Sequence, residues 1–423
     1  MSANRRYPRG LSRRAFLARG AATAAAFPTL AAFLEACSKS TSSGGSPASP
    51  TSTFSVASPA HPVKWEIASD NKPIADGLPP EQNATVNIYT YTDYLDPGAL
   101  KAFEKKYKKY NVKCTITTFE DTTEALGKIR SGGVQADIFN PSYDQMGKLV
   151  KGGLISPLNH SYIPNIANVW PSFTNPFYDQ EWRYTTPYTV YTTGIAWRTD
   201  KVSEDIAARP NPYDVLWDAK YARKLSILDD YHTAMGMVAM RNGFDINTAD
   251  TKQLATIRQQ LTLMNQTTAP KVNVTDYQDV PTNVVELCQA WSGDAFNMLS
   301  YMPAGQSPDV LRYWFPSDPT KGEVDNDLLV MLRMTKNPVM TQMFLNHMLD
   351  YTIAFNNFMF TGYQPPQTKI VPSKLVSDGT IPANLATVVV EESLFSKGQR
   401  LLELPPAVDA QWQAIWQQFK AGA

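Results

Sequence analysis

The stretch "TVNIYTYTDYLDPGALKAFEKKYKKYNVKCTITTF" (residues 85–119) decides the fold class. Residues 85–95 alternate apolar and polar side chains at first and then carry a run of tyrosines, which predicts a β-strand. Residues 96–110 begin with Asp-Pro-Gly and then place leucine, phenylalanine and tyrosine at helical spacing, which predicts a helix. Residues 111–119 alternate again and predict a second strand. Two strands joined by a helix favour parallel pairing in a sheet that helices cover.

The same alternation of strands and helices continues along the chain. A helix over 122–132, a strand over 136–142 and a helix over 143–158 follow. The further predicted elements are a strand within 188–202, a strand, acidic turn and helix over 226–244, a helix over 251–265, two helices separated by a Trp-Ser-Gly-Asp turn over 284–302, strands over 310–316 and 323–334, one long helix over 339–360 and a terminal helix over 410–422. The pattern predicts two α/β units in series.

Length and composition narrow the class of protein. The chain has 423 residues, which is enough for two domains, and 43% of them are hydrophobic. Its 39 basic residues are scattered and matched by 39 acidic ones, so we expect no nucleic-acid partner. Three cysteines and four histidines leave little room for a structural zinc site or a disulfide framework. We expect no metal and no cofactor.

The amino terminus carries export signals. Residues 12–17 read Ser-Arg-Arg-Ala-Phe-Leu, a twin-arginine signature, and an apolar stretch over 21–33 is too short for a comfortable membrane span. Residues 34–37 then resemble the lipobox of bacterial lipoproteins, although Glu35 is unusual there. We therefore predict a signal peptide over 1–36 and a lipid anchor on Cys37. The alternative is a plain signal peptide that is cut elsewhere.

The segment after the cysteine is predicted to be a tether. Residues 37–62 consist mostly of Ser, Thr, Pro and Gly and carry too little apolar bulk to offset the entropy of an ordered chain, so we expect disorder. The predicted signal peptide holds six arginines and one acid. The remaining chain would carry 33 basic and 38 acidic residues. This mildly acidic balance is compatible with a cationic ligand, but it is also common among soluble proteins.

A short motif at Trp291–Asp294, Trp-Ser-Gly-Asp, is the first candidate for binding. A buried aspartate needs a cationic partner or several hydrogen bonds, and an aromatic face attracts cations. No lysine or arginine lies within ten residues of the motif. The cation therefore comes from elsewhere in the chain or from a ligand. The alternative is that the tryptophan packs in the core and the aspartate caps a helix.

Eight segments together carry a family resemblance over about residues 85–420. They are "IYTYTDYLDPGALKAFEKKY", "DIFNPS", "KGGLISPLNHSYIPNIANVWPSFTNP", "TTGIAW", "LWDAKYARKLSILDD", "AWSGDA", "VDNDLLV" and "TGYQPP". In this order they resemble the spermidine/putrescine-binding proteins, the extracellular solute-binding components of ATP-binding-cassette (ABC) importers. The resemblance implies an α/β fold of the type 2 periplasmic-binding-protein class, with two lobes that each hold a mostly parallel sheet flanked by helices.

The resemblance also implies where the lobes lie. Two crossing segments, near Thr193–Trp197 and Asp325–Leu329, would act as the hinge. Lobe 1 would comprise residues 84–195 and 325–372, and lobe 2 residues 196–324 and 373–423. A ligand between the lobes would be buried when the hinge closes.

Site residues carry over from the family position by position. The implied ligand-binding residues are Tyr91, Tyr94, Ser142, Asp144, Asp230, Trp291, Glu323 and Asp325. A late polar position falls near Glu403, and Asp294 would support the tryptophan turn. The chain departs from the family pattern because Asp144 and Glu323 replace aromatic residues and Thr233 replaces an acid. The implied site is therefore more acidic and less aromatic, which keeps a cationic ligand but leaves its identity open.

Each of these residues also has a structural reading. Tyr91 and Tyr94 could pack under a loop, Asp230 could cap the following helix, and Asp325 could hold a crossing segment in place. An exported enzyme is the alternative class of function. No G-x-S-x-G elbow, H-E-x-x-H motif or P-loop occurs, and only His232 beside Asp230 suggests acid–base chemistry. We therefore expect no catalytic residues.

The expected function is that of a membrane-anchored, monomeric receptor on the outer face of the cell membrane. It would capture a small cationic solute, expected to be a polyamine such as putrescine or spermidine, and deliver it to the permease and ATPase subunits of an ABC importer. Aromatic walls would pack the methylenes, and carboxylates would pair with the ammonium groups. A receptor for a different amine and a sensor without a permease are the alternatives that remain within the same class.

Overall fold

The computed structural model describes residues 57–395 and 397–422. The predicted signal peptide and Cys37 lie outside the described residues. At the described end of the predicted tether, Ser58 and His61 close a turn through two backbone hydrogen bonds of 3.1 and 2.9 Å. Among the described residues, every helix is too short or too polar to span a bilayer.

The described residues form one sheet of nine strands. Its order is β2-β1-β3-β9-β4-β7-β5-β6, with β8 paired to β4. The strands are β1 (Thr85–Tyr91), β2 (Lys113–Phe119), β3 (Ile138–Phe139), β4 (Thr185–Arg198), β5 (Leu225–Leu228), β6 (Lys271–Asn273), β7 (Leu287–Trp291), β8 (Leu311–Trp314) and β9 (Glu323–Met331). The mixed order follows from two long strands in the middle, since β4 and β9 join two parallel sets.

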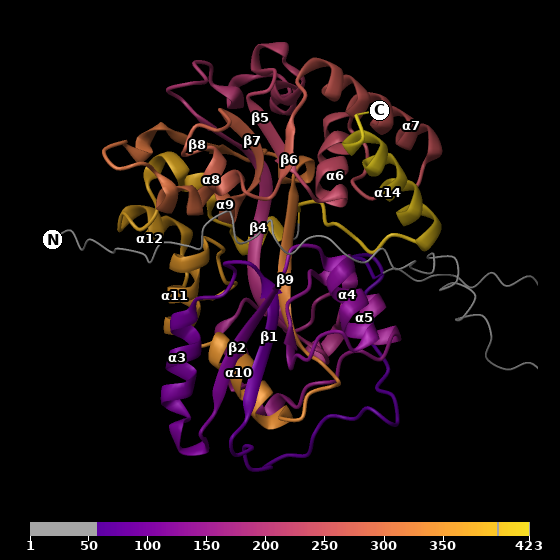
Figure 1. Cartoon of the computed structure of the whole chain (residues 1–423), viewed down its shortest axis with the longest axis vertical. Coiled ribbons are helices and arrows are strands. Elements are labelled where there is room, and N and C mark those ends of the chain that lie inside the picture. The colour runs from indigo at the N-terminus through magenta and orange to yellow at the C-terminus, as the bar shows by residue number, and fades with distance from the viewer. Residues whose placement is uncertain (1–56, 396, 423) are drawn as a thin grey trace, which may run out of the picture. The chain divides into compact units, whose positions relative to one another are not determined.

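The two parallel sets lie at opposite ends of the sheet. β1 pairs in parallel with β2 and β3, and β5 pairs in parallel with β6 and β7. β4 is antiparallel to β9 from Thr185 to Thr193, and antiparallel to β7 from Thr193 to Trp197. β7 and β9 lie on opposite edges of β4, and beyond Thr193 the place of β9 is taken by β8, which pairs with Ile195–Arg198. In Figure 1, β4 and β9 run between a lower group of elements around β1 and an upper group around β5.

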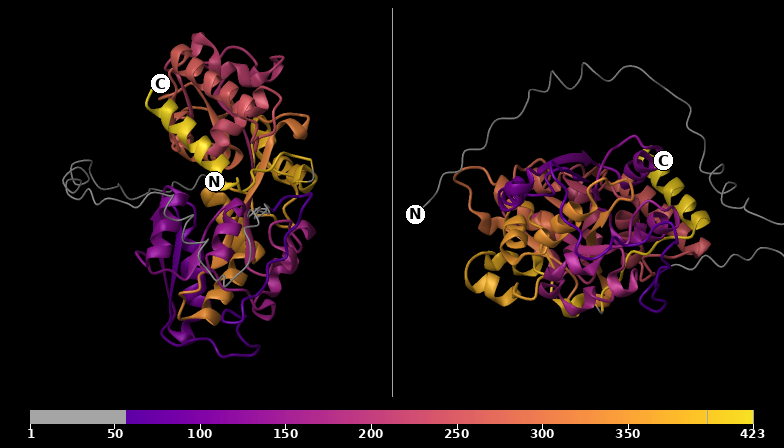
Figure 2. Two further views of the ribbon diagram at one scale, coloured as in Figure 1. Left: turned by 90° about the vertical axis from the view of Figure 1, so that its right-hand side faces the viewer. Right: turned by 90° about the horizontal axis from the view of Figure 1, so that it is seen from below.

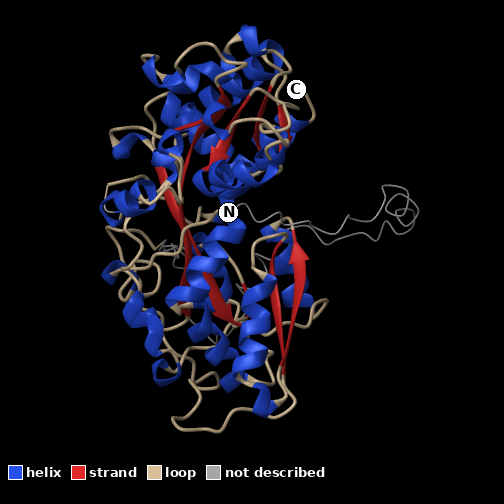
Figure 3. Cartoon of the chain, turned by 90° about the vertical axis from the view of Figure 1, so that its left-hand side faces the viewer, coloured by secondary structure: helices blue, strands red, loops and turns tan. Residues whose placement is uncertain are grey.

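Helices flank the strands in both groups (Figure 3). They are α3 (Pro97–Lys106), α4 (Thr122–Ser131), α5 (Met146–Lys151), α6 (Tyr231–Arg241), α7 (Thr251–Thr267), α8 (Asp276–Asp279), α9 (Ser292–Asn297), α10 (Pro338–Met348), α11 (Tyr351–Thr361), α12 (Pro372–Ser377), α13 (Glu392–Phe395) and α14 (Pro406–Lys420). α3 begins as its sequence predicts, because Asp96 accepts a hydrogen bond from the Gly98 amide and Pro97 occupies the first turn. The left view of Figure 2 shows α14, in yellow, on the upper group.

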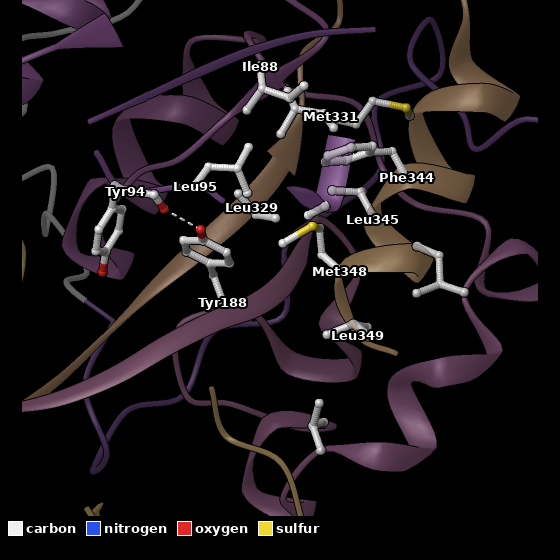
Figure 4. Packing of buried hydrophobic residues seen from close by; sticks show 14 of the residues in the cluster. Ile88, Tyr94, Leu95, Tyr188, Leu329, Met331, Phe344, Leu345, Met348 and Leu349 are labelled. Carbon is white, nitrogen blue, oxygen red and sulfur yellow. Dashed lines mark hydrogen bonds between the residues drawn. The ribbon is translucent and has the colours of Figure 1, made fainter. Parts of the chain in front are cut away.

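Strand alternation divides the core into layers. In β1, Ile88 packs in the cluster that contains Phe103 and Phe344, whereas the neighbouring Tyr89 packs on the other face with Phe139. Figure 4 shows the first of these clusters, in which the Tyr188 hydroxyl donates to the Tyr94 carbonyl oxygen. The upper group is layered in the same way, so both faces of the sheet are covered by apolar side chains.

Three predicted elements differ from the structure. Residues 287–291, predicted as helix, form β7, because this run is buried on both faces between β4 and β5 and shows no alternation. The Trp-Ser-Gly-Asp segment is not a separate turn, since its last three residues open α9. The predicted long helix over 339–360 is two helices, because Asp350 ends the first and caps α11 by accepting hydrogen bonds from the amides of Thr352 and Ile353.

Candidate functional site

The centre of the sheet carries a stripe of three acids on one strand face. Glu323, Asp325 and Asp327 alternate along β9, so their side chains share a face. Their side chains are buried, with 0%, 2% and 6% of each residue exposed. Buried charge requires a partner, so the neighbours of each carboxylate decide what the stripe can do.

Two of these carboxylates are only half satisfied. Glu323 Oε1 accepts a hydrogen bond from Thr193 Oγ1 at 2.7 Å, while Oε2 is buried without a partner. Asp325 Oδ1 accepts from Tyr143 Oη at 2.5 Å, and its Oδ2 is also buried without a partner. An unpaired buried acceptor is costly, and the two carboxyl groups also interact with each other, because, in addition to burial, repulsion from Asp325 and a hydrogen bond with it raise the pKa of Glu323.

Asp327 is held by two tyrosines. Its Oδ2 accepts from Tyr94 Oη at 2.7 Å, and its Oδ1 accepts from Tyr191 Oη at 3.4 Å. The Tyr94 hydroxyl also lies 2.6 Å from Thr189 Oγ1. The pKa of Asp327 is raised to about 7, mainly by burial and also by the nearby carboxylates of Asp325 and Asp144, while the tyrosine hydrogen bonds oppose the shift. The sequence analysis did not select Asp327.

The ends of the parallel strands converge on this stripe. Tyr91 ends β1 and Trp291 ends β7, while Asp144 follows β3 and Asp230 follows β5. Burial raises the pKa of Tyr91 well above its usual range, and the carboxylates of Asp327, Asp230 and Asp144 raise it further. Carboxylates that follow strands of the lower and the upper set therefore both raise the pKa of the Tyr91 hydroxyl. Such convergence is expected where the carboxyl ends of parallel strands meet.

Trp291 belongs to a connected set of rings. Its indole meets the Tyr191 ring edge to face at 6.3 Å, and its Nε1 is buried without an acceptor. Tyr363 contacts the rings of Tyr94 and Tyr191 at 4.8 and 5.8 Å. A Cβ at Gly293 would come within 2.4 Å of the Tyr363 ring, so the glycine of the motif makes room for this aromatic contact.

Two of the predicted residues also have local structural roles. Asp230 caps α6 by accepting a hydrogen bond from the Thr233 amide at 2.8 Å. Its pKa is nevertheless raised, first by burial and then by the Asp144 carboxylate. Ser142 donates to Asp144, which also accepts from the Gln145 side chain. The capping role of Asp230 therefore coexists with its position beside the other acids.

Arg400 is the second residue that the sequence analysis did not select. It is 8% exposed, and its Nε lies 3.2 Å from Asp325 Oδ1. The expected late polar residue, Glu403, lies instead against Gly147 of α5, and burial raises its pKa to about 7. Asp327 could have been predicted from the sequence, because the acids in "EVDND" occupy every second position and it is the third of them. Arg400 had none, because its contact joins residues 75 positions apart.

The acids of the site outnumber the bases. Among the described residues, Arg400 pairs with Asp325, and no lysine or arginine forms an ion pair with Glu323 or Asp327. Burial raises the pKa of Glu323 well above its usual range, and repulsion from Asp325 raises it further. The pKa of Asp325 rises to about 6 through burial, although Arg400 opposes the shift. A positively charged ligand would lower the pKa values of Glu323, Asp325 and Asp327.

The carboxylates are not arranged as a metal centre. Within residues 57–395 and 397–422, no group of three or more His, Cys, Asp or Glu side chains is placed to hold a metal ion. The arrangement offers buried carboxylate oxygens, tyrosine hydroxyls and ring faces, which suit an organic cation.

A family model described as bacterial extracellular solute-binding protein matches residues 98–383, more than half of the chain. The chain belongs to this family. Its members are solute-binding proteins of transport systems.

Curated relatives cover most of this solute-binding protein. The chain is 25% identical over 310 residues to the spermidine/putrescine-binding periplasmic protein 1 of Haemophilus influenzae, which covers 71% of this chain and 81% of the relative. It is 24% identical over 347 residues to the spermidine/putrescine-binding periplasmic protein of Escherichia coli, covering 81% and 93%. The family predicted from the sequence is confirmed.

Solved structures establish the fold. The spermidine/putrescine ABC transporter substrate-binding protein of Streptococcus pneumoniae superposes with a TM-score of 0.63 at 23% identity, covering 80% of this chain and 99% of that chain. A lipoprotein of Treponema pallidum gives a TM-score of 0.65 at 17% identity, covering 79% and 99%. The solute-binding protein thus has the type 2 periplasmic-binding-protein fold, and the predicted fold class is confirmed.

Proposed function

We propose that this solute-binding protein captures a polyamine, or another short chain of methylenes and ammonium groups, for an ABC importer. The observation that carries the proposal is the buried stripe of Glu323, Asp325 and Asp327, which lies among aromatic rings and retains two unpartnered carboxylate oxygens. The names of the relatives from H. influenzae and E. coli, which specify spermidine and putrescine, support the same class of ligand.

The chemistry of the site matches a cation with an apolar chain. Ring faces such as those of Trp291 and Tyr191 pack methylene groups and attract an ammonium by about 0.5–2 kcal/mol each. A buried ion pair loses several kcal/mol of hydration per ion, so it needs additional hydrogen bonds. Thr193 and the tyrosines around Asp327 supply such bonds to the carboxylates before a ligand arrives. The site is therefore preorganised for positive charge.

The ligand would be enclosed by two lobes that move about β4 and β9. We propose lobe 1 as residues 84–195 and 325–372 and lobe 2 as residues 196–324 and 373–423. The change of partner along β4, from β9 up to Thr193 to β8 from Ile195, supports this division. The proposed ligand-binding residues are Tyr91, Tyr94, Ser142, Asp144, Asp230, Trp291, Glu323 and Asp325, to which the geometry adds Asp327.

The delivery of the ligand would require an anchor and partners. We propose that Cys37 carries a lipid on the outer face of the membrane, where the protein meets a permease and an ATPase. The lipobox-like segment and the export signature support this proposal. Fractionation of cells that express the native chain and its Cys37→Ala variant tests it. Equal membrane association of both chains would contradict lipid anchoring.

Calorimetric titration tests the ligand assignment. The purified protein is titrated with putrescine, cadaverine, spermidine and butylamine as a matched monoamine. We expect saturable binding of at least one diamine or polyamine. Butylamine should bind at least tenfold more weakly, because its single ammonium group can pair with fewer carboxylates. Absence of binding by every amine would reject the ligand assignment and leave the fold unaffected.

A further inference from the structure

Arg400 lies in the kind of environment that a cationic ligand needs. Its guanidinium lies over the rings of Tyr143 and Phe395 at 4.6 and 4.5 Å. Its Nε donates to Asp325 Oδ1 at 3.2 Å, and its Nη2 donates to Asn326 Oδ1 at 2.5 Å. Aromatic faces together with a carboxylate form a cation site, and here the chain's own arginine fills it.

Backbone pairing fixes the position of this arginine. The Val324 amide donates to the Gln399 carbonyl oxygen at 3.0 Å, and the Gln399 amide donates to the Gly322 carbonyl oxygen at 2.9 Å. The segment before Arg400 is therefore bonded alongside the start of β9. With this register, the side chain reaches Asp325 from a buried backbone position.

The rest of the acid stripe has no such resident cation. Among the described residues, Glu323 and Asp327 form no ion pair with a lysine or arginine. Trp291 contacts the ring of Tyr191, whose hydroxyl donates to Asp327. One face of β9 thus presents a filled cation position at Asp325 between two carboxylates that lack a basic partner.

We propose that Arg400 determines specificity by occupying one cation position of the ligand site, so that the protein takes a short diamine and disfavours a longer triamine. This inference rests on the proposed function. A guest that extended past Asp325 would have to displace a guanidinium that is buried, hydrogen-bonded and stacked on rings. Its ammonium would otherwise lie beside a fixed positive charge, and either arrangement weakens the binding of a long chain.

The experiment compares ligand length in three chains. Putrescine and spermidine are titrated into the native protein, into Arg400→Gln and into Arg241→Gln. Arg241 is a matched control because it pairs with Asp214 at 2.7 Å and stacks on Trp217 at 4.0 Å, outside the acid stripe. We expect the native protein to bind putrescine at least tenfold more tightly than spermidine. The Arg400→Gln change should shift this ratio toward spermidine by at least tenfold, whereas Arg241→Gln should leave it unchanged.

The outcomes separate this inference from the proposed function. A native protein that binds no amine rejects the proposed function and the inference with it. A native protein that binds spermidine as tightly as putrescine rejects the inference alone, and this measurement needs no variant to fold. The ratio of putrescine to spermidine affinity could also be unchanged in an Arg400→Gln protein whose thermal unfolding shows that it is folded. That result would reject the inference and make the Arg400–Asp325 ion pair purely structural.

Discussion

The protein buries two groups of carboxyl side chains, and the comparison between them separates a structural acid from a binding acid. Asp276 and Asp294 in the upper group of elements are 0% and 5% exposed, as deeply buried as the acids of β9. They hydrogen-bond to each other, and burial raises the pKa of Asp294 to about 7 and that of Asp276 well above its usual range. One shared proton links the two carboxyl groups, while Asp276 Oδ1 is buried without a partner.

The acids of β9 differ in what surrounds them. They lie two residues apart on one strand face, beside a set of rings and beside acids that follow two other strands. Two of their oxygens have no donor. Burial and a raised pKa are common to both groups, so neither property identifies a binding carboxylate. An oxygen without a partner does not identify one either, because Asp276 Oδ1 also lacks a partner. The β9 acids are distinguished by their position between acids that follow strands of both parallel sets.

The first and last residues of the Trp-Ser-Gly-Asp motif make different contacts. Trp291 turns toward Tyr191 and the β9 acids, while Asp294 turns toward Asp276 and Tyr363. Tyr363 connects the two residues, because it hydrogen-bonds to Asp294 and contacts the Tyr191 ring that meets Trp291. The tryptophan is a candidate for binding, and the aspartate is satisfied by a neighbouring carboxyl.

The largest expected effect tests this division directly. Replacing Asp327 with asparagine removes the charge and keeps the shape, so amine affinity should fall by about a hundredfold, or about 2.8 kcal/mol. Replacing Asp294 with asparagine should change affinity by less than about threefold. Calorimetric titration of both variants with the amine that the native protein binds most tightly measures the difference. Equal losses in the two variants would mean that the acid groups are not functionally distinct.

A smaller effect is expected at the aromatic wall. The Trp291→Ala change should weaken amine binding by about tenfold, or about 1.4 kcal/mol, because it removes a ring face from the cation and the methylenes. Trp291→Phe serves as the matched variant and should recover part of the loss. Unchanged affinity in Trp291→Ala, measured on a protein whose unfolding temperature is retained, would make the indole a packing residue only.

The pH dependence of binding should follow the β9 acids. The pKa values of Asp325 and Asp327 lie at about 6 and about 7, and a bound cation favours their charged forms. Affinity for a diamine should therefore rise with pH through this window, by about tenfold from pH 6 to pH 8. Titrations at both pH values check this, and the Asp327→Asn variant should show a flatter profile. A steeper dependence in that variant would assign the titration to other groups.

The fold was largely predictable because its signals are local. The strand and helix patterns of residues 85–151 need only neighbours in sequence, and the structure follows them closely. β7 was not recognisable, since a strand covered on both faces loses its alternation. The break between α10 and α11 depends on one capping aspartate within an apolar run, which periodicity alone cannot detect.

Some residues of the candidate site could likewise be predicted from the sequence, and others could not. Tyr91, Asp144 and Trp291 were predicted because the family resemblance assigns them to the ligand site, and Trp291 also because of its Trp-Ser-Gly-Asp motif. Asp327 could have been found from the alternation within β9. Arg400 could not, since its contact with Asp325 depends on the pairing of a late segment with β9. Sequence therefore locates acids and rings, and the structure reveals which of them already have a partner.

The smallest expected effect concerns stability at the Asp276–Asp294 pair. Because burial raises the folded-state pKa of Asp294 to about 7, above about 3.9 for an unfolded aspartate, the folded state binds more protons between these values. The stability that this proton contributes is fully present below pH 4 and is lost as the pH rises through 7. Asp294→Asn lacks this titration, so its free energy of unfolding should fall less than that of the native protein between pH 6 and pH 8, by about 1 kcal/mol. Denaturant unfolding at both pH values measures the difference, and parallel profiles for the two proteins would show that the shared proton does not contribute.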